Sequence, residues 1–291
     1  MKVNRSVGAA RREDRWMPVS GDELKQLLSR DEFPRSGRYD PKWILDNQMG
    51  PNPLWLTEWL CRDMALRPGM RVLDLGSGKA LSSIFLAREY EVQVWATDLW
   101  IGADDNRKRI EESGLDKQVF PIHADARSLP YAHDYFDAIV CVDAYIYFGT
   151  DDLYLDYVHR FVKPGGQIGI VVPGFMRDLN GPLPEHLRPF WGQDCWTWHT
   201  AQCWRNHWSR TGLVDVEVAD TMPDGIGVWL QWNKARLAAG DERESVKTDI
   251  RVMEADRGEF IGFVRMIGRR KQESPDNALQ SDLGFRAARH P

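Results

Sequence analysis

The chain has 291 residues, of which 43% are hydrophobic and 28% are charged, and its formal net charge is −5. This composition is typical of a soluble globular protein with a sizeable core, and the acidic balance argues against nucleic-acid binding, which usually needs a basic surface. No apolar run reaches the roughly 18 residues of a membrane span, and the N-terminus lacks a hydrophobic secretory core, so we expect a cytoplasmic protein.

The two ends of the chain differ in character from the middle. Residues 1–20 are polar and basic and predict a flexible arm, and residues 272–291 have the composition of a disordered tail. We therefore expect one domain over residues 21–271, with an insertion at about 174–212 that carries many aromatic residues.

Short apolar runs alternate with helix-like segments through this domain. A helix is expected at 54–66, another at 81–90 and a third near 226–240, and Thr150 is the expected N-cap of the helix before the fifth strand. The runs that predict strands are 71–75, 92–98, 118–123, 136–143, 167–173, 213–219 and 260–268. Such alternation is typical of an α/β fold with a doubly wound, mostly parallel sheet and helices on both faces.

Seven of the thirteen tryptophans lie from Trp191 to Trp232, and five of these fall within the insertion at about 174–212. Large rings of this kind either pack a helical cap on the sheet or line an aromatic acceptor pocket, and the sequence leaves both open. A helix beginning near Thr200 would bury Trp204 and Trp208.

The same segment repeats a metal-like residue every four positions: Cys195, His199, Cys203 and His207. Twelve residues of helix span roughly 18 Å, so the four side chains cannot meet at one ion. We therefore predict no metal site, and we take His199 as a candidate acid–base group.

The first predicted strand ends in "DLGSGKA", residues 74–80, where Gly76 and Gly78 allow the backbone to approach a ligand closely. Asp98 closes the second strand, and an acid there suits the two hydroxyls of a ribose. A dinucleotide fingerprint would need a third glycine where this chain has Leu81. Asp74 beside the turn would repel a pyrophosphate but suits a ligand with an ammonium and a sulfonium, so the pattern favours S-adenosylmethionine.

Over about residues 45–220 the chain resembles the class I S-adenosylmethionine-dependent methyltransferases, whose motifs it carries in order. The stretches that carry the resemblance are "VLDLGSGKA" (72–80), Asp98, "HADARSLPY" (123–131), "FDAIVCVDAYIYF" (136–148) and "RFVKPGGQIGIVVP" (160–173). The resemblance implies a seven-stranded sheet in the order 3-2-1-4-5-7-6 with an antiparallel seventh strand, completed here by an aromatic-rich helical cap. One departure is Ala80, where the family often has a third glycine.

The resemblance also implies the site that would hold S-adenosylmethionine and its product S-adenosylhomocysteine. In it Asp98 holds the ribose, Asp125 and the backbone of Ala126 hold the adenine, and Asp143 borders the methionine part. The predicted cofactor-binding residues are Asp74, Gly76, Ser77, Gly78, Asp98, Leu99, Asp125, Ala126 and Asp143.

Methyl transfer from a sulfonium is an in-line displacement that leaves a neutral sulfide, so positioning and exclusion of water matter more than acid catalysis. The candidate catalytic residues are Tyr145 and Tyr147, which follow the fourth strand, and His199. Residues 39–60 precede the first strand and contain Trp43, Met49 and Trp55, which form a candidate lid.

We predict an enzyme that methylates a small-molecule acceptor in a tryptophan-rich pocket. The methylated atom (N, O or C) and the oligomeric state are not determined by the sequence. A lipid-modifying enzyme like the cyclopropane fatty acid synthases is one alternative, disfavoured because "DAYIYFG" stands where that group has a glutamate–histidine segment. A non-catalytic S-adenosylmethionine-binding protein is another, and the intact order of motifs argues against it.

Overall fold

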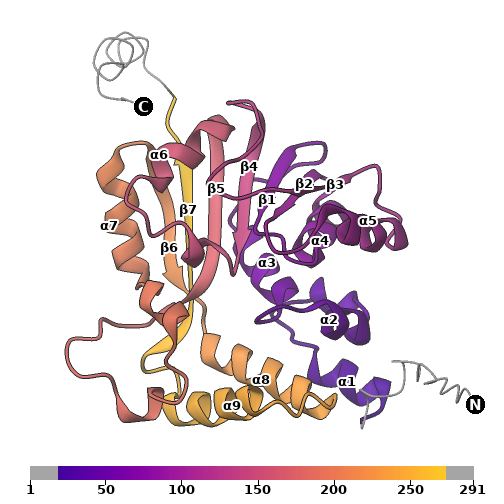
Figure 1. Ribbon diagram of the computed structural model, residues 1–291, viewed down its shortest axis with the longest axis vertical. Helices are drawn as coiled ribbons and strands as arrows, with labels where there is room; N and C mark the ends of the chain where they lie inside the picture. The colour runs from indigo at the N-terminus through magenta and orange to yellow at the C-terminus, as the bar shows by residue number, and fades with distance from the viewer. Residues whose placement is uncertain (1–18, 273–291) are drawn as a thin grey trace, which may run out of the picture.

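The computed structural model describes residues 19–272, so the predicted arm and tail lie, except at their inner ends, outside the described residues. Seven strands form one sheet in the order β3-β2-β1-β4-β5-β7-β6 (Figure 1). The strands are β1 (Arg71–Leu75), β2 (Gln93–Asp98), β3 (Val119–His123), β4 (Phe136–Val142), β5 (Val162–Phe175), β6 (Val214–Thr221) and β7 (Ile261–Arg270). β7 runs antiparallel to both of its neighbours, and the remaining pairs are parallel. The predicted strand order is confirmed.

The strands follow the apolar runs closely because the central ones are buried on both faces. In β1 four of five residues are buried, and in β4 six of seven. β5 begins at Val162, earlier than the expected residue 167, so the "KPGG" segment (163–166) forms its irregular start. There the register with β4 shifts between Phe136 and Ala138.

Nine α-helices accompany the sheet over residues 19–272. They are α1 (Gly21–Leu27), α2 (Pro41–Asn47), α3 (Pro53–Cys61), α4 (Leu81–Tyr90), α5 (Ala103–Glu112), α6 (Tyr154–Val158), α7 (Ala201–Thr211), α8 (Gly225–Ala238) and α9 (Glu244–Asp256). None of the described helices is long and apolar enough to cross a membrane.

Two glycines show that α3 and α7 cover opposite faces of the sheet. Gly169 and Gly268 belong to successive residue pairs between β5 and β7, and successive pairs point to opposite faces. A Cβ at Gly169 would touch Leu60 of α3 and Met64 just after that helix, whereas one at Gly268 would touch Trp208 of α7. Both glycines therefore let a helix lie close to the strands.

The segment predicted as an aromatic-rich helical cap is α-helical only at its end. Residues 176–200 hold the short 3-10 turns η5 (Glu185–Leu187) and η6 (Gln193–Thr197), and only then does α7 begin. Thr200 caps α7 as expected, its side chain accepting from Cys203 N at 3.1 Å, and Trp204 and Trp208 are buried. The helices that lie across one end of the sheet are instead α8 and α9, with α1 beside them (Figure 1).

Two smaller expectations about helix ends are wrong. Thr150 does not cap α6, which begins at Tyr154 with Leu153 in the N-cap position and no side-chain cap. The helix expected over 54–66 ends at Cys61. Its N-terminus is set by Asn52, whose side chain accepts from Leu54 N and Trp55 N, and by Pro53 in the first turn.

Candidate functional site

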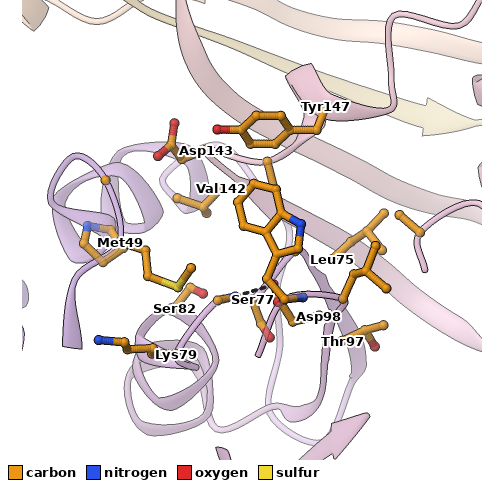
Figure 2. A pocket seen from close by; sticks show the side chains of 18 of the residues that line it. Met49, Leu75, Ser77, Lys79, Ser82, Thr97, Asp98, Val142, Asp143 and Tyr147 are labelled. Atoms are coloured by element: carbon orange, nitrogen blue, oxygen red, sulfur yellow. Dashed lines mark hydrogen bonds between the residues drawn. The ribbon is translucent and has the colours of Figure 1, made fainter. Parts of the chain in front are cut away.

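A cavity of about 380 Å³ opens where β1, β2 and β4 end. This is the edge of an open α/β sheet at which ligands bind. Its walls come from the loops after these strands, from the loop after β3, and from the loop between α2 and α3. The lining includes Met49, Gly50, Gly76, Ser77, Gly78, Lys79, Asp98, Leu99, Trp100, Asp125, Ala126, Arg127, Asp143 and Tyr147 (Figure 2).

The glycine turn after β1 is held by the end of β2. The Gly76 and Ser77 N–H groups donate to the Thr97 carbonyl at 2.8 and 3.1 Å, and Gly78 N–H donates to Asp98 Oδ2 at 2.8 Å. Gly76 has φ +77° and Gly78 has φ +53°, the left-handed region in which glycine carries no Cβ penalty. A Cβ on Gly76 would also overlap the Cβ of Ala144 in the loop after β4. Glycine at position 76 is therefore required by the backbone angle and by the approach of that loop.

The Asp98 carboxylate accepts hydrogen bonds from the loop after β1 and from the loop after β2. Its Oδ1 accepts from Trp100 N and Ile101 N at 2.7 and 2.8 Å, and its Oδ2 accepts from Gly78 N. A carboxylate oxygen can accept more than one hydrogen bond, so Oδ2 retains capacity for a donor inside the cavity. The acid predicted for a ribose thus lies in the cavity wall.

Ser77 stands out because its side chain is buried but has no partner within the described chain. The residue is 6% exposed, it lines the cavity, and its Oγ makes no hydrogen bond. A buried hydroxyl without a partner costs free energy unless a ligand or water satisfies it.

Three further predicted residues, Leu99, Asp125 and Ala126, also line the cavity. Asp125 Oδ1 accepts from Arg127 N at 2.8 Å, which shapes the loop after β3, and the Ala126 carbonyl accepts from the Tyr154 hydroxyl at 2.9 Å. Leu99 is exposed toward the cavity, and its carbonyl contacts His123 Nε2 at 2.8 Å.

Asp143 is the predicted site residue with the most unusual surroundings. Its φ is +56°, and its carboxyl lies directly against Gly50, because a Cβ on Gly50 would overlap Asp143 Oδ2. Burial, and to a lesser extent the negative charge of Asp194, raise the pKa of Asp143 to about 7. Its charge therefore changes near neutral pH.

Tyr147 reaches the same part of the cavity from η3 (Tyr145–Tyr147). Its ring lies 5.1 Å from that of Trp100, centre to centre, and its carbonyl accepts from the Arg127 guanidinium at 2.7 Å. Figure 2 shows its hydroxyl on the side of the cavity where Asp143 lies. Burial, with the charges of Asp143 and Asp194, raises the pKa of Tyr147, so its hydroxyl keeps its proton.

Three predicted site residues do not line the cavity, and Asp74 is the first. It is fully buried, and its Oδ2 accepts from Ser82 Oγ at 2.6 Å and Ser83 Oγ at 2.5 Å in the first turn of α4. Burial raises the pKa of Asp74 to about 6, partly offset by these two hydroxyls. The structure therefore places Asp74 as a residue that fixes the start of α4.

Tyr145 and His199 are the other two. Tyr145 is 1% exposed and packs edge-on against Phe148, Tyr154, Trp204 and Trp208, and its hydroxyl has no partner in the described chain. His199 is half-buried against the Trp204 ring, with centroids 5.0 Å apart, and burial lowers its pKa. Neither geometry supports a catalytic role. Among residues 19–272, no three His, Cys, Asp or Glu side chains are grouped to hold a metal ion.

Of the three predicted lid residues only Met49 lines the cavity. Trp43 stacks on Tyr39, and Trp55 is buried against Trp232. The sequence reasoning missed Lys79 and Trp100, which also line the cavity. Their signal was position alone: each directly adjoins a predicted residue, Gly78 or Leu99.

Known methyltransferases are similar to the part of the chain that carries most of these lining residues. Residues 72–166 match the family model described as "Methyltransferase domain". Methyltransferase GfsG of Streptomyces halstedii is 31% identical over 134 residues, 45% of this chain and 48% of that protein. The ubiquinone/menaquinone biosynthesis C-methyltransferase UbiE of Coxiella burnetii is 33% identical over 142 residues, 44% of this chain and 52% of that protein. The chain thus spans about half the length of these curated relatives.

Solved structures share the fold at low sequence identity. Phosphoethanolamine N-methyltransferase 2 of Haemonchus contortus, solved with S-adenosyl-L-methionine, gives a TM-score of 0.65 at 19% identity, covering 87% of this chain and 60% of that one. The [4+2]-cyclase SpnF gives 0.60 at 18% identity, covering 78% and 85%. Residues 72–166 of the chain thus match a methyltransferase domain, and the described residues share the fold of S-adenosylmethionine-dependent methyltransferases.

Proposed function

We propose that this chain binds S-adenosylmethionine in the cavity described above and transfers its methyl group to a small-molecule acceptor, with S-adenosylhomocysteine as the product. The observation that carries the proposal is the glycine turn locked to Asp98, with the unpartnered Ser77 hydroxyl beside it. We also propose that residues 21–271 work as one domain.

The cavity residues fit this group in three respects. Gly76 permits the close approach that a Cβ would block, Asp98 Oδ2 retains acceptor capacity for ribose hydroxyls, and Leu99 offers an apolar surface to a flat base. The volume of about 380 Å³ lies near the lower end of the roughly 300–1,000 Å³ typical of ligand pockets.

S-adenosylmethionine, when bound, supplies an electrophilic methyl group on a sulfonium that departs as a neutral sulfide. The chain's part is to bind, orient and exclude water. Asp98 and Asp125 would hold the nucleoside end. Asp143, once ionised, would face the cationic methionine end, and Tyr147, whose hydroxyl stays protonated, would donate a hydrogen bond that orients the acceptor.

The acceptor is proposed only as a small molecule. The relatives are named for different acceptors and atoms, among them demethylmenaquinone, phosphoethanolamine and geranyl diphosphate. The shared fold therefore does not select one of them.

Two measurements test the proposal. Calorimetry should detect S-adenosylmethionine binding, with no comparable binding of a nicotinamide dinucleotide. Incubation of the protein and methyl-labelled donor with a cell extract should then transfer label to a small metabolite that mass spectrometry identifies. Binding without any transfer would favour the non-catalytic alternative, and absence of donor binding would refute the proposal.

Replacing Tyr147 by phenylalanine tests the proposed orienting hydroxyl. We expect kcat to fall by roughly 10-fold, about the value of one hydrogen bond to a reacting group, while donor affinity stays within about 2-fold. Single-turnover kinetics with the identified acceptor give both quantities.

Tyr145→Phe is the matched control. It removes a hydroxyl that has no described partner and does not reach the cavity, so kcat and donor affinity should both be unchanged. Equal losses in the two variants, or none in Tyr147→Phe, would contradict the role given to Tyr147.

A further inference from the structure

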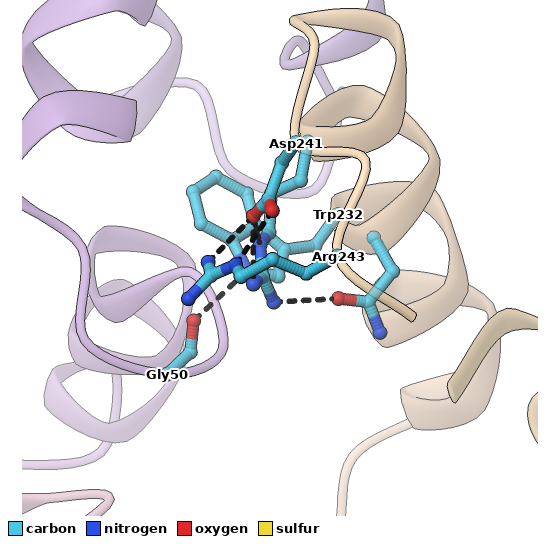
Figure 3. Close-up of polar contacts among 6 residues, drawn as sticks. Gly50, Trp232, Asp241 and Arg243 are labelled. Atoms are coloured by element: carbon cyan, nitrogen blue, oxygen red, sulfur yellow. Dashed lines mark hydrogen bonds and ion pairs between the residues drawn. The ribbon is translucent and has the colours of Figure 1, made fainter. Parts of the chain in front are cut away.

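The cavity wall between α2 and α3 is attached to a helix from the far end of the chain. Trp232 of α8 is fully buried, and its indole N–H donates to the Gly50 carbonyl at 2.9 Å (Figure 3). Its ring also packs edge-on against Trp55 of α3, with centroids 6.3 Å apart. One side chain thus contacts both the loop and the helix that follows it.

This hydrogen bond holds the loop at Gly50, where the loop packs tightly against a side chain of the cavity wall. Gly50 lies directly against the Asp143 carboxyl, so the loop forms the roof over that group. Met49 and Pro51, on either side of Gly50, line the cavity as well. A shift of Gly50 would therefore change the hydration of Asp143 and the shape of the wall together.

The helix that carries Trp232 is held rigidly. Asp241, in the turn between α8 and α9, accepts from Arg236 Nε at 3.1 Å and from Arg243 Nε at 2.6 Å. Arg236 also donates to Asn233 Oδ1 at 3.0 Å, one turn earlier on α8. A carboxylate that holds two guanidiniums by several charge-assisted bonds fixes the helical hairpin well.

A second connection joins α8 to the N-terminal segment. Gln231 Nε2 donates to the Leu27 carbonyl at 2.8 Å, and Arg30 donates to Gln231 Oε1 at 2.8 Å. α8 thus contacts residues on both sides of the Gly50 loop: Leu27 and Arg30 before it, and Trp55 after it.

We propose that Trp232 is a positioning residue: through its indole N–H it holds the Gly50 loop over Asp143 and so completes the donor-binding cavity. The expected effect on donor affinity rests on the proposed function, in which this cavity binds S-adenosylmethionine. It assigns a role in that site to the α8–α9 hairpin, which lies outside the region matched by the family model.

Trp232→Phe is the direct test, because it removes the N–H but keeps a large aromatic ring. We expect S-adenosylmethionine affinity to fall by roughly 3- to 10-fold, the effect of one lost hydrogen bond. Hydrogen exchange of the backbone amides of residues 48–50 and of Asn52 should accelerate by a similar factor. The pH midpoint of donor binding should also move below that of the wild type, because Asp143 becomes better hydrated.

Trp229→Phe is the matched control. Trp229 lies one turn earlier on α8, packs on Phe263 with centroids 4.9 Å apart, and is not among the residues that line the cavity. It loses the same volume, so any general destabilisation of α8 should appear in both variants, and thermal unfolding measures it. Donor affinity and loop exchange should stay at wild-type values in Trp229→Phe.

Wild-type affinity and loop exchange in a folded Trp232→Phe protein would overturn the inference, and so would equal losses in both variants. If the wild-type protein does not bind S-adenosylmethionine, the proposed function fails, but loop exchange in the two variants still decides whether Trp232 holds the loop.

Discussion

Replacing Gly76 by alanine is expected to lower the affinity for S-adenosylmethionine by at least about 10-fold. The residue has φ +77°, where an L-residue costs roughly 1–2 kcal/mol of folding stability. The new Cβ would also overlap the Cβ of Ala144, forcing apart two loops that both line the cavity. Calorimetric titration of the folded variant measures the loss.

Gly69→Ala separates backbone strain from the clash. Gly69 has nearly the same angle, φ +78°, but no heavy atom lies within 4 Å of the Cβ position and it does not line the cavity. This variant should lose some thermal stability and keep wild-type affinity. A Gly76→Ala protein that binds as tightly as Gly69→Ala would show that the glycine turn does not form the donor site.

The affinity for S-adenosylmethionine is expected to rise with pH up to about pH 7, by as much as about 10-fold per unit, and then to level off. The reason is Asp143, whose pKa burial raises to about 7 in the free protein. A bound ammonium and sulfonium favour the carboxylate, so below that pKa binding must release a proton. Calorimetry in buffers of different ionisation enthalpy counts the protons released.

Asp143→Asn should remove this pH dependence of donor affinity and weaken donor binding at pH 8.

The effect of pH on the folding stability of the wild type should have the opposite sign to its effect on donor affinity. Because the folded-state pKa lies above the ordinary carboxyl value of 3.8, the protonated form is favoured on folding. The wild type then loses stability as pH rises from about 4 to 7, and the variant should unfold at a higher temperature than the wild type at pH 8. If donor affinity in Asp143→Asn still rises with pH as in the wild type, the titrating group is not Asp143.

The strands were predictable because burial on both faces demands continuous apolar runs, as in "FDAIVCV" of β4. α9 was not predicted, although Val246, Ile250 and Met253 follow one another at helical spacing and are buried. Polar residues separate them, and their burial depends on packing against α8. The existence of that partner could not be read from the segment itself.

The convergence of the predicted residues at one cavity was predictable for a topological reason. Parallel strands end at the same edge of a sheet, so residues after β1, β2, β3 and β4 must converge there. The sequence could not distinguish Tyr145 from Tyr147, because a short 3-10 turn sends neighbouring side chains in different directions. Only the packing of Tyr145 among the α7 tryptophans assigns it to the core. The Gly50–Trp232 contact joins residues 182 positions apart, a separation that no local pattern signals.

The position of β7 has a consequence for biosynthesis. β7 (Ile261–Arg270) is the last of the described strands in chain order, yet it is an interior strand that separates β5 from β6. Until it emerges, the nascent chain carries β5 as an unpaired and largely apolar edge, the kind of surface that invites intermolecular pairing. Truncation before Ile261 should therefore yield an aggregating product rather than a smaller folded protein, and the nascent chain should need a chaperone most in the interval before β7 emerges.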